Sequence, residues 1–255
     1  MNFNVPFLRA FLRLFFPEPG KRPSKTLACL VVVLGLTISA TARAEISFGG
    51  FTRFIFDGEQ QSLMVTLINE DPQPALVQSL LQWGDGDRSR DLPMVVNKPL
   101  VLIPAHGRAS ITLFYQGTGL PTDRESFLLL RVMQVPQKPK EDNNMQIALQ
   151  HNMKLIFRPK LSGTLEDAVE KLRWSPDMAP GAYRAFNDSP YYLTLTEVGL
   201  RDRTGNPCGT SVEHLMIAPF SSYELVVPGC HQVAGRIAYQ FISDAGIAHA
   251  RQCDL

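Results

Sequence analysis

Short runs in which hydrophobic and polar residues alternate, or in which β-branched and aromatic residues dominate, recur along the chain from residue 51. A period of two places every second side chain on the same face of a strand. In the first half these runs predict strands at Phe51–Phe56, Leu63–Ile68, Leu76–Trp83, Leu100–Ile103, Ser110–Tyr115, Phe127–Val135 and Met145–Phe157. Turn-forming residues such as Asp57-Gly58 and Asp71-Pro72 separate them. Short strands at this density over about 110 residues favour an immunoglobulin-like sandwich.

The second half repeats the pattern. Strands are predicted at Arg184–Phe186, Tyr191–Val198, His214–Ile217, Tyr223–Val227, Arg236–Ile242 and Ile247–Arg251. Leu165–Leu172 is helix-like, although a loop followed by an edge strand fits it equally well. We therefore predict an all-β protein of two immunoglobulin-like β-sandwich domains, residues 45–160 and 161–255, joined near Lys160–Gly163.

The run Met145–Pro159 has a regular pattern. Met145, Ile147 and Leu149 lie two apart, which predicts a row of apolar side chains on one face of a strand. In the simplest interpretation this strand is half-buried and packs its own core. Lys154, in the run that leads to Phe157-Arg158-Pro159, complicates that interpretation, because a cation among apolar neighbours is rarely buried without an anionic partner.

The amino-terminal region has the features of an export signal. Basic residues from Lys21 to Lys25 precede the apolar run Leu27–Ile38, and Ala42-Arg43-Ala44 is a small-x-small cleavage site. The apolar run is too short for a membrane anchor, and Cys29 stands at its start rather than after it, which argues against a lipoprotein signal. We expect residues 1–44 to be removed, with a start codon that can lie later than Met1. No later segment predicts a membrane span.

Composition and motifs exclude several classes of function. The formal net charge of +1 argues against nucleic acid or anionic lipid as a main partner. No metal-binding histidine spacing, serine-nucleophile elbow or phosphate-binding glycine loop is present. The acidic loop Asp85–Asp91 resembles a calcium site but lacks its glycine and glutamate and contains two arginines, so we expect a turn. The sequence indicates no enzyme, metal or cofactor.

Export makes disulfides possible, and Cys208, Cys230 and Cys253 lie after the signal. If Pro219-Phe220 is the turn of a hairpin, Cys208 and Cys230 face each other across its open end and can form a disulfide. A Cys230–Cys253 disulfide is the alternative.

Several stretches resemble the PapD-like periplasmic pilus chaperones. They cover nearly all of the chain after the signal, and they are Thr52–Gly58, Leu120–Ser126, Arg131–Pro136, Gln146–Pro159, Asn187–Tyr192 and Ile242–Gly246. The Asp-Arg-Glu-Ser signature at 123–126 and the run from Ile147 to Pro159 are each specific to the family and occur in its order and spacing. The short segment Gln134–Asn144 resembles chaperones of rod-type pili, whereas three cysteines and Met145 in the row depart from the family pattern.

The resemblance implies an L-shaped pair of sandwiches that folds pilus subunits in the periplasm by donor-strand complementation and delivers them to an outer-membrane usher. In the family, cations matching Arg53 and Lys154 hold the carboxylate at a subunit's carboxy terminus. The row Met145, Ile147 and Leu149 matches the donor strand. Residues matching Glu125, Arg158 and Asp244 form an ion-pair network between the domains.

Other hypotheses remain open at this point. The exposed row predicts that something covers it in the free protein, so self-association is one possibility. An exported two-domain adhesin or pilus structural protein is the alternative function, although Glu45–Gly50 is short for a polymerising extension. A hydrolase on a β scaffold would need a nucleophile or metal set that the sequence lacks.

Overall fold

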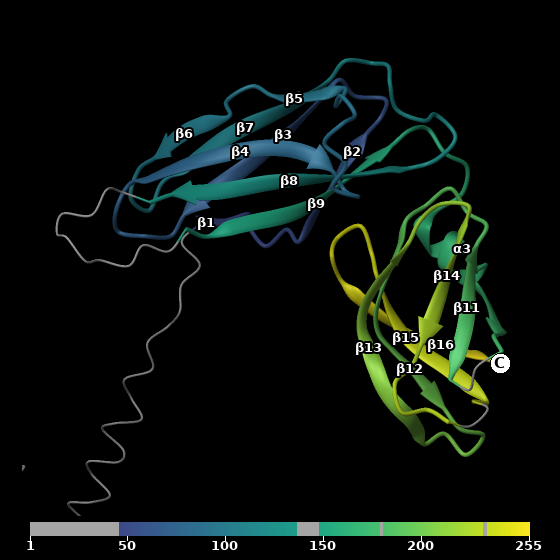
Figure 1. The fold of residues 1–255 in the computed structure, drawn as a ribbon. Coiled ribbons are helices and arrows are strands. Elements are labelled where there is room, and N and C mark those ends of the chain that lie inside the picture. Colours follow the sequence, from purple (N-terminus) through teal and green to yellow (C-terminus); the bar gives the residue numbers. More distant parts are fainter. Residues whose placement is uncertain (1–45, 137–147, 179–180, 232–233) are drawn as a thin grey trace, which may run out of the picture. The chain divides into compact units, whose positions relative to one another are not determined.

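The structure is a computed structural model that describes residues 46–136, 148–178, 181–231 and 234–255. Over these residues the chain forms two β-sandwiches, each with its own hydrophobic core (Figure 1). The predicted class, all-β with two immunoglobulin-like sandwiches, is confirmed. The L arrangement that the resemblance implied stays a prediction.

The first sandwich consists of two sheets. Its strands are β1 (Ile46–Ser47), β2 (Arg53–Asp57), β3 (Ser62–Asn69), β4 (Ala75–Trp83), β5 (Met94–Val96), β6 (Leu100–Ile103), β7 (Arg108–Tyr115), β8 (Ser126–Val135) and β9 (Gln150–Arg158). One sheet has the order β1-β3-β7-β5 and the other β2-β9-β8-β4-β6. The pairing of β2 with β9 is parallel, while the other pairings of this sandwich are antiparallel among the described residues.

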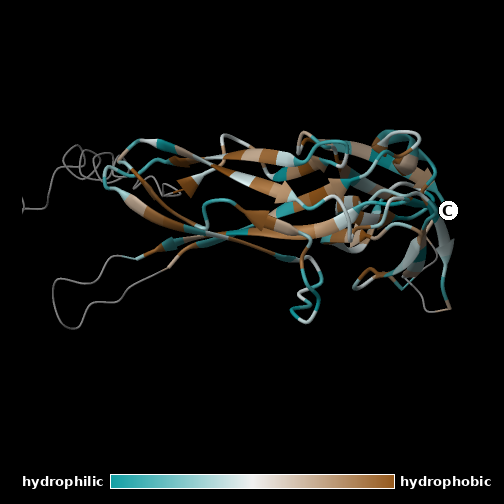
Figure 2. Ribbon diagram, turned by 90° about the horizontal axis from the view of Figure 1, so that it is seen from above, coloured by the Kyte–Doolittle hydropathy of each residue, from teal (hydrophilic) through white to brown (hydrophobic). Residues whose placement is uncertain are grey.

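Alternation along the strands builds the first core. In β8, Leu128, Leu130 and Val132 are fully buried, and the residues between them are partly exposed. Figure 2 shows the resulting change between hydrophobic and hydrophilic residues along the ribbon. The buried row of β8 packs with residues such as Leu67 and Ile111 of the facing sheet. Because one sheet face is buried, this alternation fixes the strand register.

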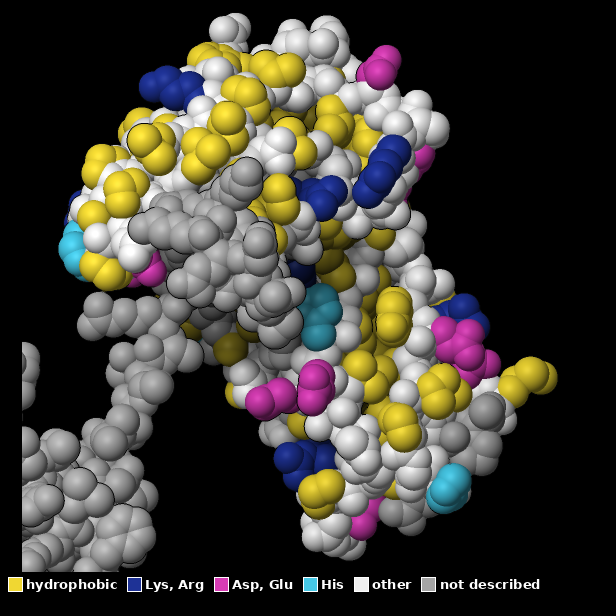
Figure 3. All heavy atoms as spheres, turned by 60° about the vertical axis from the view of Figure 1, so that its left-hand side comes forward, with side chains coloured by type: hydrophobic (Ala, Val, Ile, Leu, Met, Phe, Trp, Pro, Cys, Tyr) yellow, Lys and Arg dark blue, Asp and Glu magenta, His cyan; other side chains and the backbone are white. Residues whose placement is uncertain are grey.

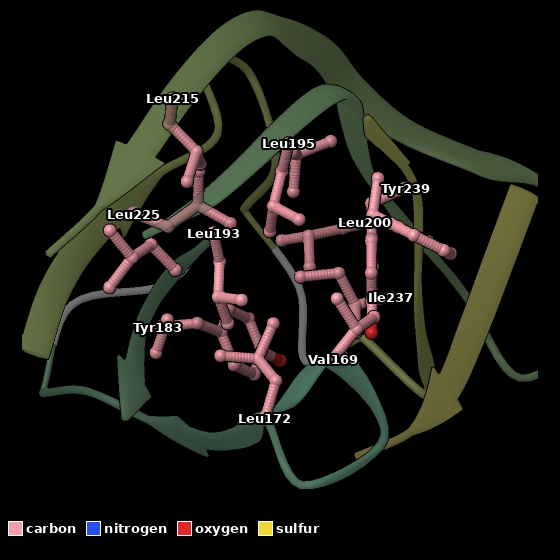
Figure 4. Packing of buried hydrophobic residues seen from close by; sticks show 14 of the residues in the cluster. Val169, Leu172, Tyr183, Leu193, Leu195, Leu200, Leu215, Leu225, Ile237 and Tyr239 are labelled. Carbon is pink, nitrogen blue, oxygen red and sulfur yellow. The ribbon is translucent and has the colours of Figure 1, made fainter. Parts of the chain in front are cut away.

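The second sandwich is built from α3 (Leu165–Glu170), β10 (Arg173–Pro176), β11 (Ala182–Asn187), β12 (Leu193–Arg201), β13 (Pro207–Ile217), β14 (Ser221–Val226), β15 (Arg236–Ile242) and β16 (Ala248–Asp254). Its sheets have the orders β10-β11-β14 and β13-β12-β15-β16. Figure 4 shows Leu193, Leu195 and Leu200 of β12 pointing into a core that Val169 of α3 also enters. Thr164 and Asp167 form a capping box that starts the helix.

Each strand predicted from the pattern has a counterpart, with ends that differ by several residues in some strands. The pattern missed β1, β5 and β10, which are two to four residues long; β6 is equally short, but it is an uninterrupted apolar run and was predicted. Between the two interpretations of Leu165–Leu172, the structure has the helix α3, and the edge strand β10 follows it.

The disulfide between Cys208 and Cys230 is present, with the two Cα atoms 4.9 Å apart, and Cys253 is free. The alternative pairing of Cys230 with Cys253 is therefore wrong. The hairpin from which the disulfide was predicted is also wrong, because β13 and β14 belong to different sheets. The turn at Pro219-Phe220 leads the chain from one sheet to the other, so the disulfide connects the start of β13 to the segment that follows β14, away from that turn.

Candidate functional site

Arg53 and Lys154 lie side by side on neighbouring strands. They are register partners at the point where β2 and β9 begin to pair. Phe56 of β2 and Leu155 of β9 point into the first core. Because side chains alternate, Arg53 and Lys154 share the opposite face of the sheet. The two cations are therefore brought together by parallel strand pairing, although they are a hundred residues apart in sequence.

Neither cation forms an ion pair with a carboxylate of the described residues. Arg53 is only 7% exposed; its Nη1 donates to the carbonyl of Ile242 at 3.3 Å, and its Nε has no hydrogen-bond partner among the described residues. Burial lowers the pKa of Arg53. Burial, and then the charge of Arg53, lowers the pKa of Lys154 to about 8. The pair is a concentration of positive charge that an anion would stabilise.

The backbone of β9 has a free edge that ends at these cations. Gln150 to Phe157 pair with β8 on one side, but pairing with β2 on the other side starts only at Lys154. Within the described part of the chain, Gln150–Met153 therefore have no strand on their second edge. An added strand could pair there, and its end would lie beside Arg53 and Lys154.

Arg158, four residues beyond Lys154 on β9, has a different environment. Its Nε donates to Oε1 of Glu125 at 2.6 Å, and its two terminal nitrogens donate to the carboxylate of Asp244 at 2.6 and 2.8 Å. The other oxygen of Glu125 accepts the backbone N–H of Tyr192 at 2.6 Å. Burial raises the pKa of Glu125, although Arg158 acts in the opposite direction. Of the three side chains predicted as a network, Glu125 and Asp244 each contact Arg158, and these contacts join β9 to segments of the second sandwich.

A glycine turn brings the second sandwich to this part of the first. Gly246 has a φ of +78°, and a Cβ there would lie 2.3 Å from the Thr52 hydroxyl. The Asp244–Gly246 turn can therefore approach the start of β2 only with glycine at this position. The same approach places the Ile242 carbonyl against Arg53.

Apolar surface borders Arg53. A pocket of about 540 Å³ is lined by Arg53, by the charged residues Arg108 and Asp244, and by apolar side chains that include Phe51, Phe54 and Met64. Phe51 is 60% exposed and Met64 is 68% exposed. Figure 3 shows hydrophobic side chains spread over the surface of the first sandwich, in the upper part of the view. Phe51, Phe54 and Met64 line one pocket, and apolar side chains that are grouped in this way are typical of a surface that a partner covers.

Of the predicted donor row, Met145 and Ile147 lie outside the described residues. Leu149 is described; it precedes β9, its side chain is 46% exposed, and its carbonyl accepts the N–H of Gln134 at 3.0 Å. The β8–β9 pairing thus already begins at Leu149. By alternation, Leu149 lies on the same face as Met153 and Leu155.

The acidic loop forms a turn whose carboxylates bind an internal arginine. Arg90 forms ion pairs with Asp85 and Asp87, and both carboxylates also accept backbone N–H groups. Among the described residues, no group of three or more His, Cys, Asp and Glu side chains could hold a metal ion. None of the described helices is long and apolar enough to cross a membrane.

Sequence reasoning missed three partners of this site: the Tyr192 N–H, the Ile242 carbonyl and the imidazole of His214, whose Nε2 lies 2.7 Å from Lys154 Nζ. Two of these are backbone groups, which carry no residue-specific signal. His214 is one of five histidines in a chain whose strand pattern does not show which of them would meet β9.

Comparison with known proteins gives matches along nearly the whole described chain. Residues 49–162 match the family of pili and flagellar-assembly chaperones, PapD N-terminal domain, and residues 167–252 match the pili assembly chaperone PapD, C-terminal domain. The probable fimbrial chaperone YadV of Escherichia coli is 32% identical over 237 residues, which cover 88% of this chain and 95% of the relative.

Solved structures show the same similarity. The crystal structure of the YadV chaperone has a TM-score of 0.71 at 31% identity and covers 83% of this chain and 100% of its own. A chain in the complex of the Salmonella enterica SafA pilin with the SafB chaperone has a TM-score of 0.69 at 28% identity, covering 85% of this chain and 99% of its own.

Proposed function

Because the chain belongs to the family of PapD-like pilus-assembly chaperones, we propose that it binds pilus subunits and holds a subunit's terminal carboxylate between Arg53 and Lys154. The observation that carries this proposal is the pair of adjacent cations without a carboxylate partner among the described residues. A carboxylate has two oxygens, and two cations can engage it by charge-assisted hydrogen bonds.

The free edge of β9 also favours a pilus subunit as the bound partner. A subunit strand that adds to Gln150–Met153 would gain backbone hydrogen bonds along that edge. If its last residue reached Lys154, its terminal carboxylate would lie at the cations. Strand addition by chaperones to pilins is a known form of peptide recognition. The SafB chaperone is known in complex with a pilin, which supports a pilin as the guest here.

The donor row Met145, Ile147 and Leu149 belongs to this proposal. Its side chains would fill pockets in the subunit while the backbone pairs with it. Each fully buried apolar side chain contributes roughly 1.5–3 kcal/mol. The exposed Leu149 and the apolar surface around Phe51 and Met64 are consistent with such a covered face.

The cellular setting is also a proposal. We expect export to the periplasm with removal of residues 1–44, domains at 45–160 and 161–255, and transfer of the subunit to an outer-membrane usher. The Cys208–Cys230 disulfide fits an oxidising compartment. In the free protein, self-association is one way to cover the apolar row. The family is one of chaperones, and this role needs no catalysis; the adhesin alternative has no observation in its favour.

The test is co-purification of the tagged protein with candidate pilins from the periplasm. Wild type is compared with Arg53→Ala and Lys154→Ala, with Lys98→Ala, an exposed lysine of the first sandwich, as the matched control. We expect each site variant to bind the pilin about tenfold more weakly or worse, because a charge-assisted bond is lost. Equal recovery with all four proteins, each folded by circular dichroism, would refute the assignment of these two cations.

A further inference from the structure

His214 is the described side chain that contacts Lys154 most directly. Lys154 Nζ lies 2.7 Å from Nε2 of His214. His214 belongs to β13 of the second sandwich, where Leu215 and Ile217 point into the core. By alternation, His214 lies on the outward face of that strand, with Thr196 of β12 as its register partner. The second sandwich thus contributes a side chain to the site formed by Arg53 and Lys154.

The chemistry of the two groups fixes their roles in the free protein. A lysine ammonium has three N–H donors and no acceptor, so Nζ donates and Nε2 accepts. His214 is therefore neutral, with its proton on Nδ1. The charged groups that act on it among the described residues are Lys154 from β9 and Arg53 from β2, while β12 opposes it with the uncharged Thr196. Burial and these two cations lower the pKa of His214.

We propose that His214 is a third member of the carboxylate site: it accepts a hydrogen bond from Lys154 while the site is empty, and it takes up a proton and donates to the carboxylate when a subunit binds. The proton comes from solvent and forms the Nε2–H bond; no other bond is made or broken. This inference rests on the proposed function. It adds that a residue of the second sandwich, His214, binds the subunit's carboxylate, and that subunit binding is coupled to the uptake of one proton.

Binding of an anion makes this change favourable. An opposite charge within about 4–6 Å stabilises the protonated imidazole. A carboxylate has about four lone-pair sites and can accept from Arg53, Lys154 and His214 together. Protonation turns the imidazole from an acceptor for Lys154 into a donor to the anion, and the donor that Lys154 then releases can also engage the anion. A histidine that only braced Lys154 would take up no proton.

The first test uses the free protein and acetate as the carboxylate probe. Imidazole nitrogen NMR follows His214 in sodium chloride and in sodium acetate at the same ionic strength, with His214→Gln for assignment. We expect the Nδ1–H tautomer in chloride and a His214 pKa that acetate raises by about 1. A His214 pKa that is the same in both salts, or an Nε2–H tautomer in chloride, would overturn the inference.

The second test is the pH profile of pilin affinity, with the pilin recovered in the co-purification. From about pH 5.5 to pH 7.5, wild-type affinity should fall about tenfold, because a pKa rise of about 1 is a tenfold change. His214→Gln keeps a hydrogen-bonding side chain but cannot titrate, so its profile should be flat over that range. His231→Gln, the matched control, should follow wild type. Parallel profiles for His214→Gln and wild type would overturn the inference.

The two tests separate failure of this inference from failure of the proposed function. If no pilin binds any variant at any pH, the proposed function fails, and the NMR titration still decides whether His214 responds to a carboxylate. If pilins bind through Arg53 and Lys154 but His214 does not respond, only this inference fails.

Discussion

Arg158 and Lys154 lie four residues apart on one face of β9, and their environments are opposite. Arg158 donates to two carboxylates, those of Glu125 and Asp244, at 2.6 to 2.8 Å. These contacts raise its pKa although burial alone would lower it. Lys154 contacts a neutral imidazole and has a second cation, Arg53, as its strand neighbour, and its pKa falls to about 8.

Their partners distinguish a cation that stabilises the fold from one that is available to bind another molecule. Both are basic residues on the same face of one strand, so residue type and position in the strand do not show which of them is structural. The charge of Arg158 is satisfied within the chain, and removing it would harm the structure. Neither Arg53 nor Lys154 forms an ion pair with a carboxylate among the described residues. Asp244 and Glu125 act on Arg53 only at longer range, and burial disfavours the charge of both cations. A guest would offset that cost.

The largest effect should follow from Arg158→Met. It leaves the Glu125 carboxylate, whose side chain is 1% exposed, without its cation. Breaking a buried pair by removing one partner costs about 3–5 kcal/mol. We therefore expect the free energy of unfolding, measured in urea, to fall by about 3 kcal/mol.

Its control is the double variant Arg158→Met with Glu125→Gln, which removes the unpaired charge as well. If the ion pair is the cause, the double variant should recover part of the lost stability. A loss of less than about 1 kcal/mol in the single variant, which is the size of effect expected for a surface ion pair, would contradict the view that Arg158 is the structural cation of the two.

Particular residues show how far the sequence alone could predict this site. Alternation predicted β8 and β9, and the family resemblance picked out Arg53 and Lys154, whose adjacency the structure then revealed. The Cys208–Cys230 disulfide was predicted from a hairpin that does not exist, because a turn between two sheets has the same local sequence signals as a turn within one.

Other parts could not be predicted for physical reasons. The contact of His214 with Lys154 depends on how β13 meets β9, and no local pattern encodes that distance. The carbonyl of Ile242 and the N–H of Tyr192 are backbone groups that any residue would provide. Strand β5 is three residues long, which is shorter than the alternation needed to recognise it.

A smaller effect of opposite sign is expected for Lys154→Met. Methionine keeps the length of the side chain and removes a charge that burial and Arg53 disfavour. After allowance for solvent screening, we expect the free protein to gain about 1 kcal/mol, or about 2–4 °C in Tm at pH 7. The same variant should fail to retain pilin.

Lys98→Met, the matched control, should change Tm by less than about 1 °C. A Tm that falls in Lys154→Met would place Lys154 with Arg158 as a structural cation.

The smallest effect is a pH dependence that isolates the charge of Lys154. Its pKa in the folded protein, about 8, is below the ordinary value of 10.5, so the unfolded chain binds more protons between these two pH values. Stability rises with pH wherever the unfolded state binds more protons, so the Lys154 contribution should make wild type more stable as the pH rises through this window.

Lys154→Met lacks that contribution. The stability advantage of Lys154→Met over wild type, measured by urea unfolding, should therefore be greatest near neutral pH and shrink as the pH approaches 10.5. An advantage that stays constant with pH would mean that the methyl group packs better than the ammonium, and that the unpaired charge is not what distinguishes Lys154 from Arg158.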